Sequence, residues 1–224
     1  MMKRLAIYDM DRTITRLPTF VSFLLHAARR RHPWRLLLVP FVGVTAALYG
    51  LRLIDRARLK VWNQSLLVGA SIHPEELGPI ADSFADKTLR GNVLADAKAR
   101  IAADHAEGYQ LIMATASYRL YAEAIARKLG FDATVATNTL AGLDTRVMAK
   151  IDGENCYGPA KLRMVTAWMH DAGIARDDAH IRFYSDHVSD SPAMEWADEA
   201  FAVNAHGPLR RMAKARGWTI LDWT

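Results

Sequence analysis

The sequence predicts an α/β protein: a doubly wound parallel sheet with a small α-helical cap inserted after the first strand. Three observations predict this class. From about residue 91 onward, short apolar runs alternate with helical patterns, as parallel strands joined by helices do. Two acidic clusters, residues 9–13 and 186–190, each follow an apolar, strand-like run. Between the first strand and the alternating part lies a segment, residues 16–90, that is basic and apolar with helical patterns.

The elements can be predicted in chain order. Residues 5–9 form an apolar run that predicts the first strand. Residues 18–31 have a helix-like apolar face with Pro18 near the helix start. Residues 72–89 read as an amphipathic helix that follows Ser71, with Pro74 and two acids in its first turn. Further helices are expected at 93–107, 118–129 (stopped by Gly130), 161–170 and 209–215, and strands at 109–115, 134–138, 146–151, 181–185, 200–204 and 219–223, the last at an edge. The domain division that follows is a catalytic core of residues 1–15 and 91–224, and a cap of residues 16–90.

Composition limits the class of protein. A chain of 224 residues, 51% hydrophobic and 24% charged, is globular rather than disordered and can form one core with a small accessory domain. The single cysteine, Cys156, excludes an intrachain disulfide and suits a reducing compartment. We expect no signal peptide, because the first strand begins after only four residues.

Positive charge is concentrated in the cap. Residues 16–60 carry nine basic side chains and one acid, Asp55, so this segment has a net charge of +8 within a chain of +5. The basic residues are Arg16, Arg29, Arg30, Arg31, Arg35, Arg52, Arg56, Arg58 and Lys60. Residues 36–51 form an uncharged stretch of 16 residues, shorter than the ~20 that cross a bilayer. A buried cap helix, an interfacial or re-entrant element and a short span are all compatible with it.

Asp9 and Asp11 end the first strand. Side chains two residues apart in an extended strand share a face, so these two carboxylates are expected to lie close together. Such a pair costs electrostatic energy unless a cation or a shared proton relieves it. A solvated strand end is the alternative for this pair taken alone.

Residues at three further places in the sequence indicate that this pair belongs to a functional site. Thr115 ends the strand 109–115, Lys161 lies in the first turn of the helix that follows Gly158-Pro159, and the strand 181–185 runs into Asp186 and Asp190. The carboxyl ends of parallel strands meet at one edge of a sheet, where such folds bind ligands. This ordered set resembles the haloacid dehalogenase-like phosphohydrolase superfamily, and in particular its phosphoserine-phosphatase-like branch. The resemblance covers nearly the whole chain.

The resemblance and the chemistry of carboxylates assign roles to the two acidic clusters. Asp9 is the candidate nucleophile, forming an aspartyl-phosphate, and Asp11 the acid and then base of the two half-reactions. Carboxylates of this kind suit Mg²⁺. The resemblance implies the carboxylates of Asp9 and Asp186 and the backbone carbonyl of Asp11 as metal ligands, with Asp190 orienting metal-bound water or holding Lys161. Zinc is disfavoured, since no His or Cys residues cluster.

The remaining candidates surround these groups. Thr115 is expected to donate its hydroxyl to a phosphoryl oxygen, and Lys161 to place positive charge beside it. For each residue alone, a helix cap or a solvated position would be the simpler interpretation. Thr13 is expected to support the loop after Asp11. The tentative substrate-binding residues are Arg12, His187 and Ser117, of which Ser117 is also a candidate helix cap and the other two could equally be solvated.

The cap suggests the substrate. Residues 20–24, the sequence 29–33 and the apolar stretch after them resemble the cap of bacterial phosphatidylglycerophosphatase C, a membrane-associated member of the same superfamily. Basic residues flanking an apolar stretch suit an anionic membrane surface, so we expect a lipid phosphomonoester as substrate, a cytoplasmic location peripheral to the inner face of the membrane, and no nucleic acid partner. The alternatives are a soluble phosphatase of the phosphoserine type, a phosphotransferase or mutase, and a non-catalytic, membrane-bound regulatory module.

Overall fold

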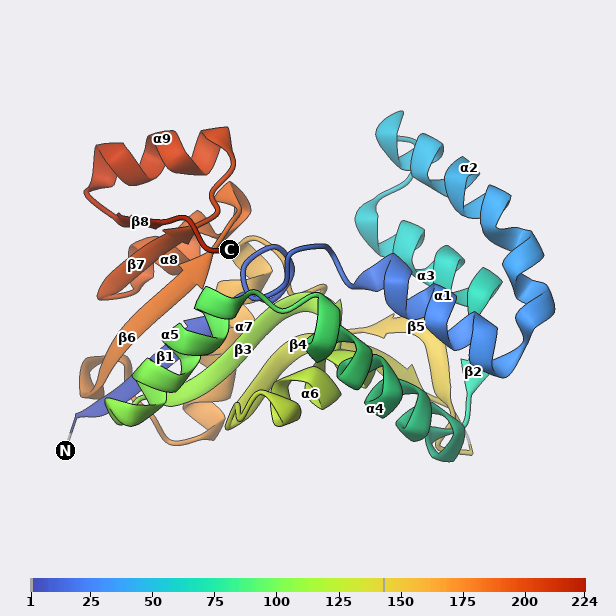
Figure 1. Ribbon diagram of the computed structural model, residues 1–224, viewed down its shortest axis with the longest axis horizontal. Coiled ribbons are helices and arrows are strands. Elements are labelled where there is room, and N and C mark those ends of the chain that lie inside the picture. Colours follow the sequence, from blue (N-terminus) through green and yellow to red (C-terminus); the bar gives the residue numbers. More distant parts are fainter. Residues whose placement is uncertain (1, 143) are drawn as a thin grey trace.

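A sheet of eight strands, with helices on both faces, organises the molecule (Figure 1). The computed structural model describes residues 2–142 and 144–224. The strands lie in the order β2-β5-β4-β3-β1-β6-β7-β8, and the six from β4 to β8 are parallel. These six are β4 (Ala133–Ala141), β3 (Gln110–Tyr118), β1 (Lys3–Tyr8), β6 (Ala179–Ser185), β7 (Glu199–Val203) and β8 (Thr219–Leu221). The predicted class is confirmed, and each of these strands overlaps a predicted one.

The predicted sheet was wrong in one respect, because its other end is antiparallel. β5 (Val147–Asp152) pairs antiparallel with β4, and β2 (Ser71–Ile72) pairs antiparallel with β5. The connection from β4 to β5 is only residues 142–146, too short for the crossover that a parallel pair needs. β2 escaped prediction because two residues show no alternation.

Neighbouring strand residues face two separate cores. Tyr8 and Met113 pack on one side of the sheet, and Ile7 and Ile112 pack on the other, as the alternation of strand side chains requires. The first face is covered by α5 (Ala95–Ala106) and α6 (Arg119–Lys128), and α4 (Pro74–Gly91) packs on α6. The second face is covered by α7 (Pro159–Asp171), α8 (Ser191–Trp196) and α9 (Gly207–Arg216). This is the doubly wound arrangement.

The segment after β1 forms a separate group of helices to one side of the sheet (Figure 1). It contains α1 (Phe20–Arg31), the 3₁₀ helix η1 (Pro33–Leu38), α2 (Val39–Gly50) and α3 (Arg56–Leu67). α3 was not predicted, although Asp55 caps it by accepting a hydrogen bond from the backbone N–H of Arg58 at 2.7 Å. The buried face of α3 contains Lys60, Asn63 and Gln64, so the apolar periodicity that identifies helices is absent there. The boundary of the cap stays a prediction.

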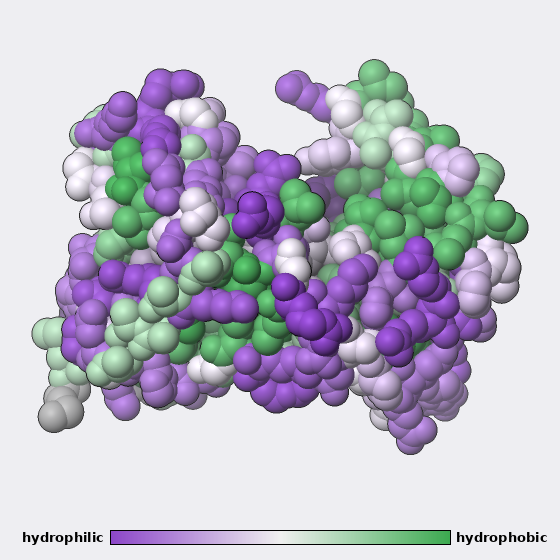
Figure 2. Space-filling view, in the orientation of Figure 1, coloured by the Kyte–Doolittle hydropathy of each residue, from purple (hydrophilic) through white to green (hydrophobic). Residues whose placement is uncertain are grey.

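Helix α2 presents its apolar side chains to solvent. The segment Pro33–Gly50 is apolar and long enough to cross a membrane by length and composition, and only 6% of it is buried. Leu37 is 78% exposed and Phe41 55%. Figure 2 shows the apolar side chains gathered over this end of the cap. A buried cap helix, one of the interpretations that the sequence left open, does not describe this segment.

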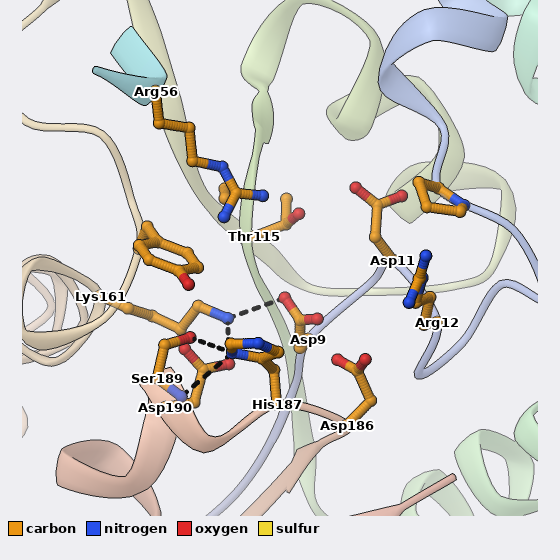
Figure 3. A pocket seen from close by; sticks show the side chains of 13 residues that line it. Asp9, Asp11, Arg12, Arg56, Thr115, Lys161, Asp186, His187, Ser189 and Asp190 are labelled. Carbon is orange, nitrogen blue, oxygen red and sulfur yellow. Dashed lines mark hydrogen bonds and ion pairs between the residues drawn. The ribbon is translucent and has the colours of Figure 1, made fainter. Parts of the chain in front are cut away.

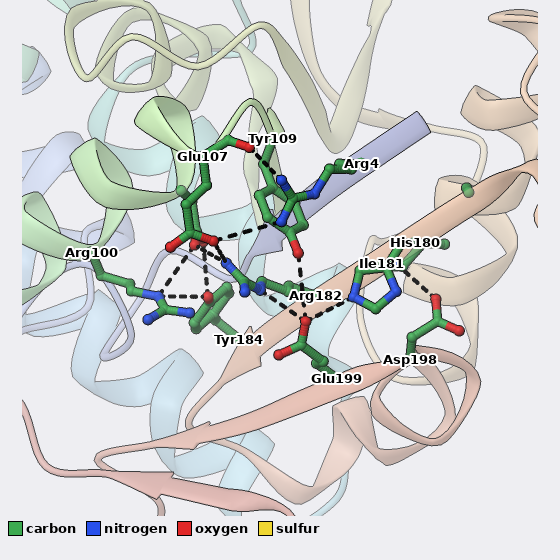
Figure 4. Close-up of polar contacts among 12 residues, drawn as sticks. Arg4, Arg100, Glu107, Tyr109, His180, Ile181, Arg182, Tyr184, Asp198 and Glu199 are labelled. Carbon is green, nitrogen blue, oxygen red and sulfur yellow. Dashed lines mark hydrogen bonds and ion pairs between the residues drawn. The ribbon is translucent and has the colours of Figure 1, made fainter. Parts of the chain in front are cut away.

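A cluster of ionic and aromatic side chains stabilises the face of the sheet beneath α5 (Figure 4). The fully buried carboxylate of Asp104 accepts hydrogen bonds from the hydroxyls of Tyr8 at 2.5 Å and Tyr184 at 2.8 Å. It also forms ion pairs with Arg182 at 2.7 Å and Arg100 at 3.3 Å. The rings of Tyr8 and Tyr184 stack with centroids 4.1 Å apart. Both carboxylate oxygens of Asp104 are thus paired.

Candidate active site

A pocket of about 250 Å³ lies at the carboxyl ends of the parallel strands. Eight of the ten residues predicted for the site line it: Asp9, Asp11, Arg12, Thr115, Lys161, Asp186, His187 and Asp190. The structure therefore brings together residues that come from β1, β3, β6 and α7 (Figure 3). Thr13 and Ser117 lie outside this lining.

The loop after β1 turns sharply within five residues. The backbone N–H groups of Ile14 and Thr15 both donate to the carbonyl of Met10 at 3.0 Å. Arg12 within this turn has φ of 64°, a left-handed conformation that costs a non-glycine residue about 1 kcal/mol and is found at functional sites. The turn keeps Asp9, Asp11 and Arg12 at the pocket. Thr13 is fully buried beneath it, and its hydroxyl has no hydrogen-bond partner among the residues that the structure describes.

Lys161 joins the two acidic clusters. Its ammonium donates to Asp9 Oδ1 at 2.7 Å and to Asp190 Oδ2 at 2.6 Å (Figure 3). Gly158, with φ of 60°, and Pro159 start α7 so that Lys161 lies in its first turn, where it is 2% exposed. Burial opposes the charged form of this ammonium, but the adjacent Asp190 and Asp9 raise the pKa of Lys161 above its ordinary value. The lysine therefore stays charged.

One ammonium faces three carboxylates. Burial, together with the charges of Asp190 and Asp186, raises the pKa of Asp9 to about 7 against the opposing effect of Lys161. Burial likewise raises the pKa of Asp186 to about 6. Asp190 Oδ1 is buried and has no hydrogen-bond partner among the described residues. The site has an excess of negative charge that its own side chains do not neutralise.

The Asp11 carboxylate points away from Lys161, toward the cap (Figure 3). Its Oδ1 accepts from the backbone N–H of Thr19 at 2.7 Å and from the Thr19 hydroxyl at 2.8 Å. Its Oδ2 accepts from the Ser117 hydroxyl at 2.8 Å. Ser117, predicted to cap a helix or to bind substrate, orients Asp11 through this bond, and the residue that precedes α6 is Tyr118. Thr19 was missed, although a threonine just before a helix is a recognisable capping signal.

His187 and Thr115 occupy opposite sides of the pocket. The His187 ring stacks on that of His206, with centroids 4.3 Å apart and planes at 3°, and burial followed by the charge of His206 lowers its pKa. His187 Nδ1 accepts a hydrogen bond from the backbone N–H of Ser189 at 3.1 Å. Thr115 Oγ1 accepts from the backbone N–H of Ser117 at 3.1 Å, so its own proton is free to be donated into the pocket.

The cap contributes residues that the sequence analysis did not single out as site residues. Arg56, at the start of α3, lines the pocket, and its guanidinium lies 4.2 Å from the centre of the Tyr157 ring. Lys60, one turn further along α3, is 5% exposed and donates to the carbonyl of Ala116 and to Asn155 Oδ1. The charge count of the cap included both cations, but it could not indicate that they turn inward.

The donor set fits a hard divalent cation. Asp9 and Asp186 bring two carboxylates to the same pocket, and their raised pKa values and the unpaired Asp190 oxygen mark a deficit of positive charge. Mg²⁺ takes oxygen ligands of this kind and keeps several waters. No group of three or more His, Cys, Asp or Glu side chains in the described residues is arranged for a metal ion. The resemblance requires only two carboxylates and one backbone carbonyl.

Comparison with known proteins identifies the family. A family model described as haloacid dehalogenase-like hydrolase matches residues 6–195. A probable phosphatase of Mycobacterium tuberculosis is 32% identical over 138 residues, which make up 59% of this chain and 45% of that protein. The chain spans about half the length of the curated relatives it matches.

Two solved structures agree over nearly the whole chain. A protein of unknown function from Bordetella pertussis Tohama I has a TM-score of 0.86 and 26% identity, over 99% of both chains. A phosphoserine phosphatase, in the form of a phospho-aspartyl intermediate analogue, has a TM-score of 0.62 and 16% identity, over 99% of this chain and 94% of that one. The latter likeness shows a shared fold, with the helical insertion included. With both acidic clusters inside the matched range, the chain belongs to the haloacid dehalogenase-like hydrolases.

Proposed function

We propose that this protein is a Mg²⁺-dependent phosphomonoester hydrolase that acts through an aspartyl-phosphate on Asp9. The observation that carries the proposal is the convergence of Asp9 and Asp190 on one buried ammonium, Lys161, with Asp186 in the same pocket at the carboxyl edge of the sheet. An anionic phosphoryl group is attacked slowly unless its charge is neutralised and its position fixed. In this proposal Lys161 supplies one positive charge, and a bound Mg²⁺ would supply the rest.

The reaction divides into two displacements. In the first, an Asp9 oxygen attacks phosphorus, the bond from phosphorus to the substrate oxygen breaks, and Asp11 gives its proton to the leaving alkoxide. In the second, water attacks the phosphorus of aspartyl-phosphate, Asp11 takes a proton from that water, and Asp9 is released with inorganic phosphate. Lys161 and the Thr115 hydroxyl hold the phosphoryl oxygens. Proton transfer by Asp11 is worth roughly 10²- to 10⁴-fold in rate.

Magnesium completes the charge balance in this proposal. Asp9, Asp186 and the backbone carbonyl of Asp11 would hold the cation. Asp190 would hold the Lys161 ammonium in place beside it. When bound, the cation neutralises charge on the phosphoryl oxygens and favours the ionised form of Asp9.

We further propose a phospholipid head group, such as that of phosphatidylglycerophosphate, as the substrate. Support comes from the exposed apolar side chains of η1 and α2, including Leu37 and Phe41, and from the exposed arginines around them. Those arginines are Arg16, Arg29, Arg30, Arg52 and Arg58. An anionic bilayer satisfies both features, since each basic residue near its surface contributes about 1 kcal/mol. Binding at the cytoplasmic face of the membrane follows from this proposal.

A phosphatase screen tests the catalytic part. Phosphate release is measured from phosphatidylglycerophosphate, phosphoserine and glycerol 3-phosphate, with and without Mg²⁺, for wild type and Asp9→Asn. We expect release only with Mg²⁺ and only from wild type, fastest from the lipid. No release from any monoester would refute the hydrolase and leave the non-catalytic module. Preference for phosphoserine would favour the soluble alternative, and transfer to an added alcohol would indicate a phosphotransferase.

Liposome flotation tests the membrane part. Wild type should float with anionic vesicles and much less with zwitterionic ones, and the double variant Leu37→Ser/Phe41→Ser should lose most of this binding. Met2→Ser is the control, because Met2 is 63% exposed but lies at the opposite end of the molecule (Figure 1). Equal flotation of the double variant and wild type would show that α2 does not bind the membrane.

A further inference from the structure

Lys60 is a buried cation without a carboxylate partner in residues 2–142 and 144–224. Its ammonium donates to two neutral acceptors, the Ala116 carbonyl and Asn155 Oδ1. No ion pair of Lys60 is formed within the described residues. Burial, followed by the charge of Arg56, lowers the pKa of Lys60 to about 7. The positive charge of a buried ammonium that bonds only neutral groups is not compensated. An anionic ligand would compensate it.

Lys60 lines a second cavity, of about 220 Å³, that adjoins the catalytic pocket. The two cavities share Asp11, Pro18, Arg56 and Ala116. We call the second cavity the annex. Asp11 lies between the phosphoryl site and the annex, and it is the proposed proton donor to the leaving oxygen. The leaving group must extend from that oxygen, and the annex is a cavity that adjoins Asp11.

The charges that face the annex favour an anion. Arg56 and Lys60 are its two cations, and Asp11 is the one acid among its lining residues. Both Asp11 oxygens already accept hydrogen bonds, from Thr19 and Ser117. An ammonium group in the annex would therefore meet two like charges and no unoccupied carboxylate. The rest of the wall is apolar and includes Phe20, Val21 and Leu59.

We propose that the annex is a leaving-group subsite for a second anionic group on the substrate, a phosphodiester or a carboxylate, and that Lys60 determines this specificity with Arg56 at the entrance. The inference rests on the proposed phosphatase and refines its substrate class. Substrates with a neutral or a zwitterionic leaving group lose the contacts that Lys60 offers. The anion can belong to a lipid head group or to its water-soluble counterpart.

Steady-state kinetics on matched substrates test this subsite. The set is phosphatidylglycerophosphate in detergent micelles, its deacylated soluble form, glycerol 3-phosphate and phosphoserine. For wild type we expect kcat/KM to be highest for the two compounds that carry the phosphodiester. In Lys60→Met, KM for these two should rise about 10- to 100-fold, the loss expected for one charge-assisted hydrogen bond, while KM for glycerol 3-phosphate is unchanged.

Variants with known charge and position complete the design. Lys60→Arg should retain the preference because it keeps the cation, and Arg56→Gln should weaken it in the same direction. Lys87→Met is the matched control, since Lys87 is an exposed lysine of α4 outside both cavities. If thermal unfolding shows that Lys60→Met is not folded, the test of the anionic preference rests on Arg56→Gln, because Arg56 is exposed.

Four outcomes would overturn the inference while leaving the phosphatase intact, and the last of them concerns the acyl chains. One is a wild type that hydrolyses glycerol 3-phosphate as well as the anionic pair. The second is a Lys60→Met variant that slows all substrates equally, which indicates a structural contact between α3 and the core. The third is a preference for phosphoserine. A wild type inactive on every compound would instead refute the proposed function itself. A lipid preference with an inactive deacylated form would place the specificity in the acyl chains rather than the annex.

Discussion

Two buried clusters of charged side chains contain residues from the same two strands, β1 and β6, or directly after them. In one cluster the negative charge is fully paired, and in the other it is in excess. Tyr8 of β1 and Tyr184 of β6 serve the cluster around Asp104, where one carboxylate has two hydroxyl donors and two arginines (Figure 4). Asp9 and Asp186 follow directly after those strands and belong to the site, where Lys161 pairs with two carboxylates, Asp9 and Asp190, beside a third, Asp186 (Figure 3).

This difference in charge balance suits the Asp104 cluster to stabilising the fold and the pocket around Asp9 to the proposed reaction. A buried carboxylate with every oxygen paired contributes to a rigid fold, and removing it leaves its partners uncompensated. A group of carboxylates with too few positive charges beside it destabilises the fold. Binding a cation lowers that cost, and the same crowded carboxylates are available for catalysis. Adjacent residues of one strand, Tyr8 and Asp9, thus belong to clusters with opposite effects on stability.

The largest effect should follow from Asp9→Asn. The amide cannot form the acyl phosphate, so we expect kcat to fall by about 10⁴- to 10⁶-fold, as for the loss of other nucleophiles. The same change removes one of three crowded negative charges, so the melting temperature should equal or exceed that of wild type. Phosphate release and calorimetry measure the two quantities. A variant that loses stability along with activity would contradict the contrast drawn here.

Asp104→Asn should have the converse result. Breaking a buried, fully paired ion cluster typically costs about 3–5 kcal/mol, so the free energy of unfolding should fall by that amount in urea denaturation. Turnover per folded molecule should stay at the wild-type value, because Asp104 lies outside the pocket. Loss of turnover without loss of stability would assign this cluster to the reaction instead.

Magnesium should stabilise the protein through the site alone. At about 100 times its dissociation constant, a ligand bound only to the native state adds about 2.7 kcal/mol. We expect this gain in wild type and in Tyr8→Phe, and its absence in Asp186→Asn. Thermal unfolding with Mg²⁺ or with a chelator gives the readout. An equal gain in Asp186→Asn would place the cation elsewhere.

Tyr8→Phe should have the smallest effect. It deletes one of the hydrogen bonds to Asp104 and keeps the stacking on Tyr184, so the expected loss is about 1 kcal/mol. Its activity should match wild type although residue 8 adjoins the nucleophile. Reduced kcat with unchanged stability would mean that the two clusters are not separable.

The sequence predicted the site better than it predicted the cap. Asp9, Thr115 and Asp186 could be brought together in advance because the carboxyl ends of parallel strands meet at one edge. The six parallel strands could likewise be predicted from their apolar runs. The roles of these residues stay predictions until variants are assayed.

Helices α1 and α4 of the cap were predicted, but the segment between them reverses the usual distribution of side chains. η1 and α2 expose apolar residues such as Leu37 and Phe41, and α3 buries polar groups such as Asn63, whose Oδ1 accepts from the Thr45 hydroxyl at 2.6 Å. Periodicity identifies a helix by an apolar face turned inward. Where that face is polar, neither α3 nor the inward direction of Arg56 and Lys60 can be predicted from the pattern.

Thr19 connects the first helix of the cap to Asp11. It is the residue that precedes α1, and both its N–H and its hydroxyl donate to Asp11 Oδ1. The orientation of the Asp11 carboxylate therefore depends on where α1 begins. A substitution that shifts the start of α1 would turn this carboxylate without touching any other residue of the pocket.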